Sequence, residues 1–137
     1  MISLSNAKII KIDNVIINGN IGIFDTEVVS LASSDIMGDI ILSNIKKEFL
    51  IQNIHFKQNN EIINNGYIIT LKESSKGTIS NITVDADVNA KQIISIYDCS
   101  NLIIKDSNFN GSLNKMKDIS NFHTEYLYYL TIVTLTK

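Results

Sequence analysis

Arginine, proline and tryptophan are all missing from this chain of 137 residues. Its 12 basic residues are all lysine, so the chain lacks the planar guanidinium fork that binds carboxylate, phosphate or guanine through two parallel hydrogen bonds. The net charge of -2 provides no general attraction to nucleic acid or to an anionic membrane. We therefore expect no nucleic acid among its partners.

Cysteine and long apolar runs are also scarce. Cys99 is the single cysteine, so no disulfide can form within the chain, and we interpret it as a small buried side chain rather than a reactive thiol. No basic segment followed by an apolar segment opens the sequence, and no apolar run approaches the roughly 20 residues that span a bilayer. We expect a protein made in the cytoplasm without a signal peptide, with no membrane insertion.

Isoleucine and asparagine, by contrast, are abundant, with 27 and 17 residues. An AT-rich genome is one explanation, but β-branched isoleucine also favours strands, and asparagine favours tight corners because it tolerates a left-handed backbone. The apolar segments are mostly four to six residues long, which suits strands rather than helices. Residues 112–126 are the best helix candidate.

The strongest signal is a repeat with a 25-residue step. Residues 67–71 align with residues 92–96, Ser75 aligns with Ser100, and Ile79 aligns with Ile104. A period of this length indicates stacked supersecondary units.

A short motif recurs within this repeat: an apolar residue, two mostly polar residues, then alternation that ends on a large apolar residue. Hairpin turns at Asn18-Gly19 and Asn65-Gly66 would allow an antiparallel meander, but a meander does not predict a constant step. A parallel coil does, because each turn places equivalent residues about 4.8 Å above the last. The register of residues 18–48 stays open. The motif occupies residues 12–17, 51–56, 79–84 and 104–109 and, in degenerate form, residues 128–133.

The polar corner of the motif holds Asn14, Asn53, Asn81 and Asp106. With this corner and its coil length, the chain resembles the right-handed parallel β-helix family, the pectate-lyase-like fold that also occurs in phage tailspikes. The resemblance covers about residues 7–133. It implies an all-β fold: a single domain over residues 1–137, a short right-handed parallel β-helix of about five coils, in an oligomer. The four corner residues form either a structural ladder that satisfies backbone groups or a polar stripe for a ligand.

Enzymes of this family act on polysaccharides. The resemblance implies that a pectate lyase would need an arginine base beside calcium-binding acids, and a polygalacturonase several aspartates, a histidine and an arginine-containing segment. Neither set is complete here, because the chain has no arginine. Asp85 and Asp87 are weak catalytic candidates, since on a strand they would share a face about 7 Å apart and glycoside hydrolysis needs carboxyls about 5 to 9.5 Å apart. The alternative is a solvated corner.

The histidines add no further site. His55 lies between Ile54 and Phe56 and is expected to face outward as an ordinary strand residue. His123 and Glu125 are too close and too common a pair to indicate a metal site. We expect no cofactor and no bound metal.

The C-terminal stretch differs from the other strands, because it is apolar or aromatic on both faces. Either a loop buries it, or it forms a subunit interface. The tailspike resemblance implies side-by-side packing in a homotrimer, or contact with other virion proteins. The interface candidates are Tyr126, Tyr128, Tyr129, Leu130, Ile132 and Leu135.

The leading functional hypothesis is a non-enzymatic structural or adhesive module of a larger assembly, such as a phage or virion fibre, spike or decoration component. Its partners would include surface polysaccharide, and its location would be the virion or another assembly. The first alternative is a polysaccharide lyase or glycoside hydrolase with an inter-subunit site. The second is a bacterial surface or interaction protein built on the same coil.

Overall fold

The computed structural model describes residues 1–57, 67–85, 92–108, 119–120 and 129–134. Within these ranges every regular element is a β-strand and every strand pairing is parallel. No helix able to cross a membrane occurs in the described part of the chain. The all-β prediction is therefore confirmed, with two parallel sheets. Of the helix candidate at residues 112–126, the structure describes only residues 119–120, and these form a strand.

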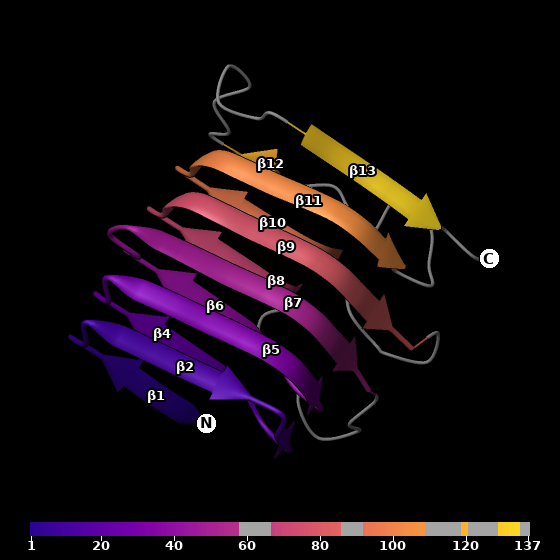
Figure 1. Cartoon of the computed structure of the whole chain (residues 1–137), viewed down its shortest axis with the longest axis horizontal. Coiled ribbons are helices and arrows are strands. Elements are labelled where there is room, and N and C mark those ends of the chain that lie inside the picture. The colour runs from indigo at the N-terminus through magenta and orange to yellow at the C-terminus, as the bar shows by residue number, and fades with distance from the viewer. Residues whose placement is uncertain (58–66, 86–91, 109–118, 121–128, 135–137) are drawn as a thin grey trace.

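Apart from the two-residue β3 (Ile16–Ile17), which follows β2 in the same sheet, successive strands alternate between the two sheets, so that each repeat unit contributes one main strand to each (Figure 1). Six such units are stacked within the described residues. The first sheet contains, in spatial order, β1 (Ile2–Ser5), β4 (Ile21–Phe24), β6 (Ile40–Ser43), β8 (Tyr67–Lys72), β10 (Gln92–Tyr97) and β12 (Ile119–Ser120). The second contains β2 (Ile9–Asp13), β5 (Val28–Ile36), β7 (Glu48–Phe56), β9 (Ser75–Val84), β11 (Ser100–Asn108) and β13 (Tyr129–Thr134), while β3 (Ile16–Ile17) also pairs with β5.

The strand register confirms the 25-residue step in the middle of the chain. Gln92 pairs with Tyr67, Ser100 pairs with Ser75, and Ile104 pairs with Ile79. Equivalent residues of neighbouring units therefore stack directly on one another.

The early repeat units are shorter, which explains why residues 18–48 gave no register. Leu31 pairs with Ile12 on one side and with Ile51 on the other. An additional motif at residues 31–36 thus lies between the motifs at 12–17 and 51–56. It escaped detection because its step is 19 and 20 residues and because Ala32 and Ser34 replace more typical side chains.

At the other end of the stack the predicted alignment is wrong by two residues. The degenerate motif placed Tyr128 over Ile104, whereas Ile104 pairs with Leu130. The register of β13 on β11 also shifts between Ile104 and Asn108, so this last pairing is less regular than the others.

The core consists of stacked apolar columns, in which Leu31, Ile51, Ile79 and Ile104 form one column with at most 1% exposure each. Fully burying one such side chain stabilises the fold by about 1.5–3 kcal/mol. Cys99 is also buried, as predicted, and burial raises the pKa of its thiol. It is therefore a packing residue rather than a reactive thiol.

Buried serines replace isoleucine at two inward positions and satisfy backbone groups there. Ser107 Oγ donates to Lys105 O at 2.9 Å and accepts from Ile82 N at 3.2 Å. Ser34 makes the equivalent pair of bonds with Ala32 O and Val15 N. The polar Ser107, which interrupts the motif, thus binds backbone groups of two neighbouring units.

Gly77 creates room for an aromatic ring in the adjacent unit. It stacks on Phe49, which is 3% exposed, and a Cβ atom at Gly77 would overlap that ring. The large and the small residue therefore share one space in the core.

We expect Gly77→Ala to lower the free energy of unfolding by about 1–3 kcal/mol, because overpacking forces the ring of Phe49 out of its position. Combining it with Phe49→Leu should cost less than the sum of the two single changes, since the smaller side chain leaves room for the methyl group. Urea unfolding of the four proteins measures this coupling, and simple additivity would contradict the packing explanation.

Asp39 is the buried polar residue that the fold satisfies least. It is 4% exposed, and its Oδ2 has no hydrogen-bond partner among the described residues. The Asp39 backbone N–H donates to Asn20 Oδ1 at 2.9 Å, but this bond does not involve the carboxyl oxygen Oδ2. Burial raises the pKa of Asp39 from 3.8 to about 6.

Because the folded state binds the Asp39 proton more tightly than the unfolded state, stability should fall as the pH rises from about 4 to about 6, by up to about 3 kcal/mol. Asp39→Asn should remove this pH dependence. Urea unfolding across this pH range measures it, with the same substitution at the exposed Asp106 as the matched control. A variant with an unchanged slope would show that another group titrates.

Candidate functional site

The predicted corner residues occupy one bend of the second sheet. Asn14, Asn53, Asn81 and Asp106 all have positive φ, between 50° and 56°. Neighbouring strand pairs place them in one column, together with Ser33 at 51°. Asparagine and aspartate tolerate this left-handed backbone better than other residues with a Cβ atom.

The bend divides each long strand of the second sheet into two segments. Buried positions step from Ile51 to Ile54, three residues rather than two, because the residue at the bend turns outward. Asn81 Nδ2 donates to Asn53 Oδ1 at 2.6 Å along the exposed side of this column.

A second column of bends, after the strands of the first sheet, was missed from the sequence. Asn44 Nδ2 donates to Asp25 Oδ1 at 2.7 Å within it. The available signal was an asparagine or acidic residue directly after each short apolar strand. Its members, all with positive φ, are Asn6, Asp25, Asn44, Glu73 and Asp98.

Beyond the bend, four charged or titratable side chains form a chain of contacts on the second sheet. His55 Nε2 donates to Asp85 Oδ1 at 2.6 Å, since a carboxylate can only accept. His55 Nδ1 lies 3.7 Å from Asp35 Oδ1, and Asp35 Oδ2 accepts from Lys57 Nζ at 2.6 Å. The imidazole therefore lies between two aspartates, one of which is neutralised by lysine.

These side chains come from three adjacent strands. Asp35 and His55 stack in register on β5 and β7, whereas Lys57 directly follows β7 and Asp85 directly follows β9. Each of the four side chains is between 31% and 39% exposed. This group, called the polar cluster below, is therefore half-buried but reachable from solvent. Its members are Asp35, His55, Lys57 and Asp85.

A shallow depression of about 220 Å³ adjoins this polar cluster. His55 and Thr83 line it from the strands, and Asn53 and Asn81 line it from the bend. It presents amide, hydroxyl and imidazole groups side by side, which are the donors and acceptors that hold an uncharged polar ligand.

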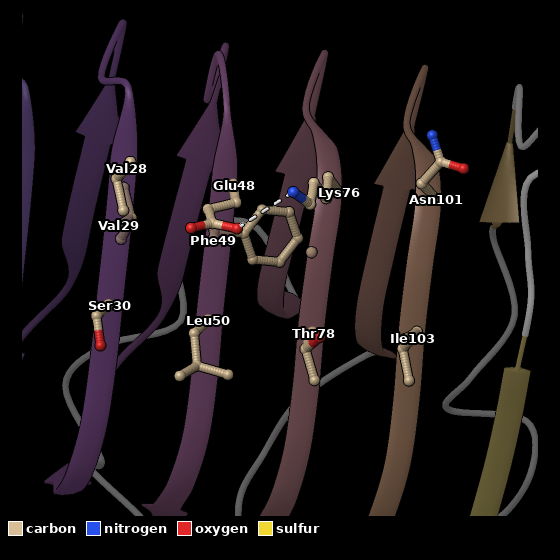
Figure 2. Close-up of a pocket in the computed structure, with 11 residues that line it drawn as sticks. Val28, Val29, Ser30, Glu48, Phe49, Leu50, Lys76, Thr78, Asn101 and Ile103 are labelled. Atoms are coloured by element: carbon tan, nitrogen blue, oxygen red, sulfur yellow. Dashed lines mark ion pairs between the residues drawn. The ribbon is translucent and has the colours of Figure 1, made fainter.

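A larger depression of about 440 Å³ lies on the second sheet before the bend. Ser30, Leu50, Thr78 and Ile103 line up across four strands along it (Figure 2). Lys76 Nζ lies 3.6 Å from Glu48 Oε2 at its edge, and both side chains are mostly exposed, so this ion pair stabilises the fold little.

Of the two predicted catalytic candidates, Asp85 and Asp87, the structure describes only Asp85. Asp85 lies in the polar cluster, but its contact is His55. Asp87 and His123 lie outside the described residues. Within the described part of the chain, no group of three or more His, Cys, Asp or Glu residues could hold a metal ion.

His55 aligns with Thr83 and, one unit further, with Asn108, as the repeat predicted. Its contacts with Asp35 and Asp85 were missed. The register of the unit that contains Asp35 was unknown, and Asp85 reaches back from a position beyond the end of its strand.

The predicted subunit interface is described only in part. Tyr126, Tyr128 and Leu135 lie outside the described residues. Tyr129, Leu130 and Ile132 belong to β13, whose backbone pairs with β11 and whose side chains are not described. The interface stays a prediction.

Comparisons with protein-family models, with curated proteins and with solved structures find no match for this chain. Its function is therefore argued from its own geometry.

Replacing Asn81 distinguishes a backbone role of the corner from a side-chain role. Asn81→Ala should lower the free energy of unfolding by about 1–2 kcal/mol, because alanine resists positive φ. Asn81→Gly should cost less than half as much, because glycine adopts this conformation freely. Thermal and urea unfolding measure both, with Ser80→Ala on the neighbouring extended residue as a control. Equal losses for alanine and glycine would assign the effect to the hydrogen bond with Asn53.

Proposed function

We propose that this chain is a short right-handed parallel β-helix that serves as a non-enzymatic structural or adhesive module and binds uncharged carbohydrate on its second sheet. The coil is supported by strands that alternate between two wholly parallel sheets in a constant order. Right-handed connections between parallel strands are strongly favoured, which supports the handedness.

The observation that carries the carbohydrate proposal is the His55–Asp85 hydrogen bond beside a shallow polar depression. A side chain held by such a bond is already oriented, so less conformational entropy is lost when a ligand binds. The aligned hydroxyl and apolar side chains before the bend, such as Thr78 and Leu50, extend the same surface. A long glycan could follow it across several strands.

The charges of this surface indicate which class of glycan it would bind. The polar cluster holds two aspartates against Lys57, and the whole chain carries a net charge of -2 without any arginine. Uronate or sulfate groups would be repelled by Asp85, while neutral sugars would meet donors and acceptors. We therefore propose neutral rather than acidic polysaccharide as the ligand.

The wider assignment to a virion fibre, spike or decoration component rests on the tailspike resemblance. A stack of similar repeat units is suited to a structural role, because each unit contacts mainly its neighbours and the stack can extend in one direction. Fold alone does not decide function, so a bacterial surface or interaction protein stays the alternative. Capsid or tail genes beside its own gene would favour the virion.

The second candidate function is a polysaccharide lyase or glycoside hydrolase. Its supporting observation is that His55 is oriented by Asp85, as a general base is oriented by a carboxylate. Against it, the imidazole fills the space between Asp35 and Asp85, so a glycosidic bond cannot lie between these two carboxyls as hydrolysis requires.

Binding is tested by titrating the labelled protein with neutral and acidic oligosaccharides and following its NMR spectrum. We expect neutral oligosaccharides to shift the resonances of Asn53, His55, Asn81 and Thr83. His55→Gln and Asp85→Asn should each weaken binding by about tenfold, the effect of one lost charge-assisted hydrogen bond.

Lys47→Gln is the matched control, because Lys47 pairs with the half-buried Glu27 ahead of the second-sheet strands, away from the polar cluster. Binding that survives both cluster substitutions, or no spectral change with any sugar, would refute the carbohydrate proposal. Release of shortened sugars by the wild type, lost in His55→Gln, would establish the enzyme instead.

A further inference from the structure

The N-terminal end of the stack leaves an open edge on each sheet. β1 and β2 are the terminal strands in the two sheet orders, so each pairs with a neighbour on one side only among the described residues (Figure 1). Such an edge is a template for pairing with another chain unless it is protected, and proline, a common protecting residue, is absent from this sequence.

This end also exposes the apolar core. Ile9 and Ile16, on the outward face of this end, are 70% and 74% exposed, so the apolar surface here is not confined to the core side. The inward residues Ile10 and Ile12 are only partly buried, whereas Leu31, directly above Ile12, is 1% exposed. A partner that covered β2 would therefore complete the core at this end.

The backbone groups available on the edge follow from the existing hydrogen bonds. Val28 N donates to Lys8 O, and Asn14 N donates to Ala32 O, so the even-numbered residues of this strand face β5. Alternation along a strand then directs the N–H and C=O groups of Ile9, Lys11 and Asp13 towards the open edge.

Those groups are self-complementary in one antiparallel register. When Ile12 lies opposite Ile12 of a second copy, Lys11 lies opposite Asp13 of that copy, and the reverse pair forms as well. Both are hydrogen-bonded pairs, which exchange two backbone bonds each. The charged side chains of Lys11 and Asp13 are exposed and lie on the same face, so each pair also brings opposite charges together.

The neighbouring registers are unfavourable. A shift of two residues places Lys11 opposite Lys11, or Asp13 opposite Asp13, and like charges directly opposite one another are destabilising. A shift of one residue pairs backbone groups that face the open edge with groups that face β5. Of these registers, the one centred on Ile12 alone satisfies both the charges and the backbone.

We propose that a second copy of this chain docks on the open edge of β2, antiparallel and centred on Ile12, to form a two-fold dimer. The second sheet then continues across both molecules. A two-fold contact uses the same surface on both copies and closes on itself, so it does not grow into a fibre. This dimer uses a different surface from the predicted C-terminal interface, and it forms without carbohydrate.

Sedimentation equilibrium of the purified full chain tests the dimer. We expect a concentration-dependent dimer whose dissociation constant rises by about tenfold or more in Lys11→Glu, where an acid faces Asp13. The charge swap Lys11→Asp with Asp13→Lys should restore the dimer, because opposite charges again face each other. Lys72→Glu, on an exposed position of the interior strand β8, is the matched control and should dimerise as the wild type does.

Hydrogen exchange provides an independent readout. The amides of Lys11 and Asp13 should exchange more slowly as the protein concentration rises, and this protection should disappear in Lys11→Glu. Circular dichroism checks that each variant is folded. A monomeric wild type, an oligomer insensitive to Lys11→Glu, or a charge swap that fails to restore the dimer would overturn the proposal.

Discussion

Parallel pairing of each strand with its equivalent in the next repeat unit is the constraint on which the rest of the structure depends. It places every side chain about 4.8 Å from the corresponding side chain above and below it. The apolar side chains of one column, such as Leu31, Ile51 and Ile79, then pack on one another and are buried. Where the stacked residues of neighbouring units differ in size, their shapes have to be complementary, as Gly77 is to the ring of Phe49.

The bends are the second condition for this stacking, because strands of successive units stay in register only if the chain turns at the same point in every unit. Positive φ at Asn53, Asn81 and their equivalents makes that turn, and short polar side chains tolerate it. Next to the bend the backbone loses ladder partners, and Ser34 and Ser107 supply them from inside. The buried serines and the exposed asparagines thus serve the same turn from opposite sides.

The candidate surfaces are consequences of the same register. Stacking brings Asp35 and His55 together from different units, and the chain leaving β9 adds Asp85, which produces an oriented imidazole on an otherwise simple sheet. β2 is the terminal strand of the second sheet, so its outer edge has backbone groups without a neighbouring strand among the described residues, and its inward isoleucines are only partly buried. One rule of construction therefore explains both the proposed carbohydrate surface and the proposed dimer edge.

The sequence by itself determined the all-β class, the 25-residue register of the central units and the corner positions, because each of these repeats locally. It did not determine the shorter early units, where Ala32 and Ser34 obscure the motif and a changed step removes the periodic signal. The contacts of His55 were decided only by the tertiary structure, since they join side chains 20 and 30 residues apart in the chain. Repetition along a sequence can reveal which residues stack. Predicting which charged side chains of different units come into contact also requires the register of every unit between them, and only the tertiary structure supplies that register.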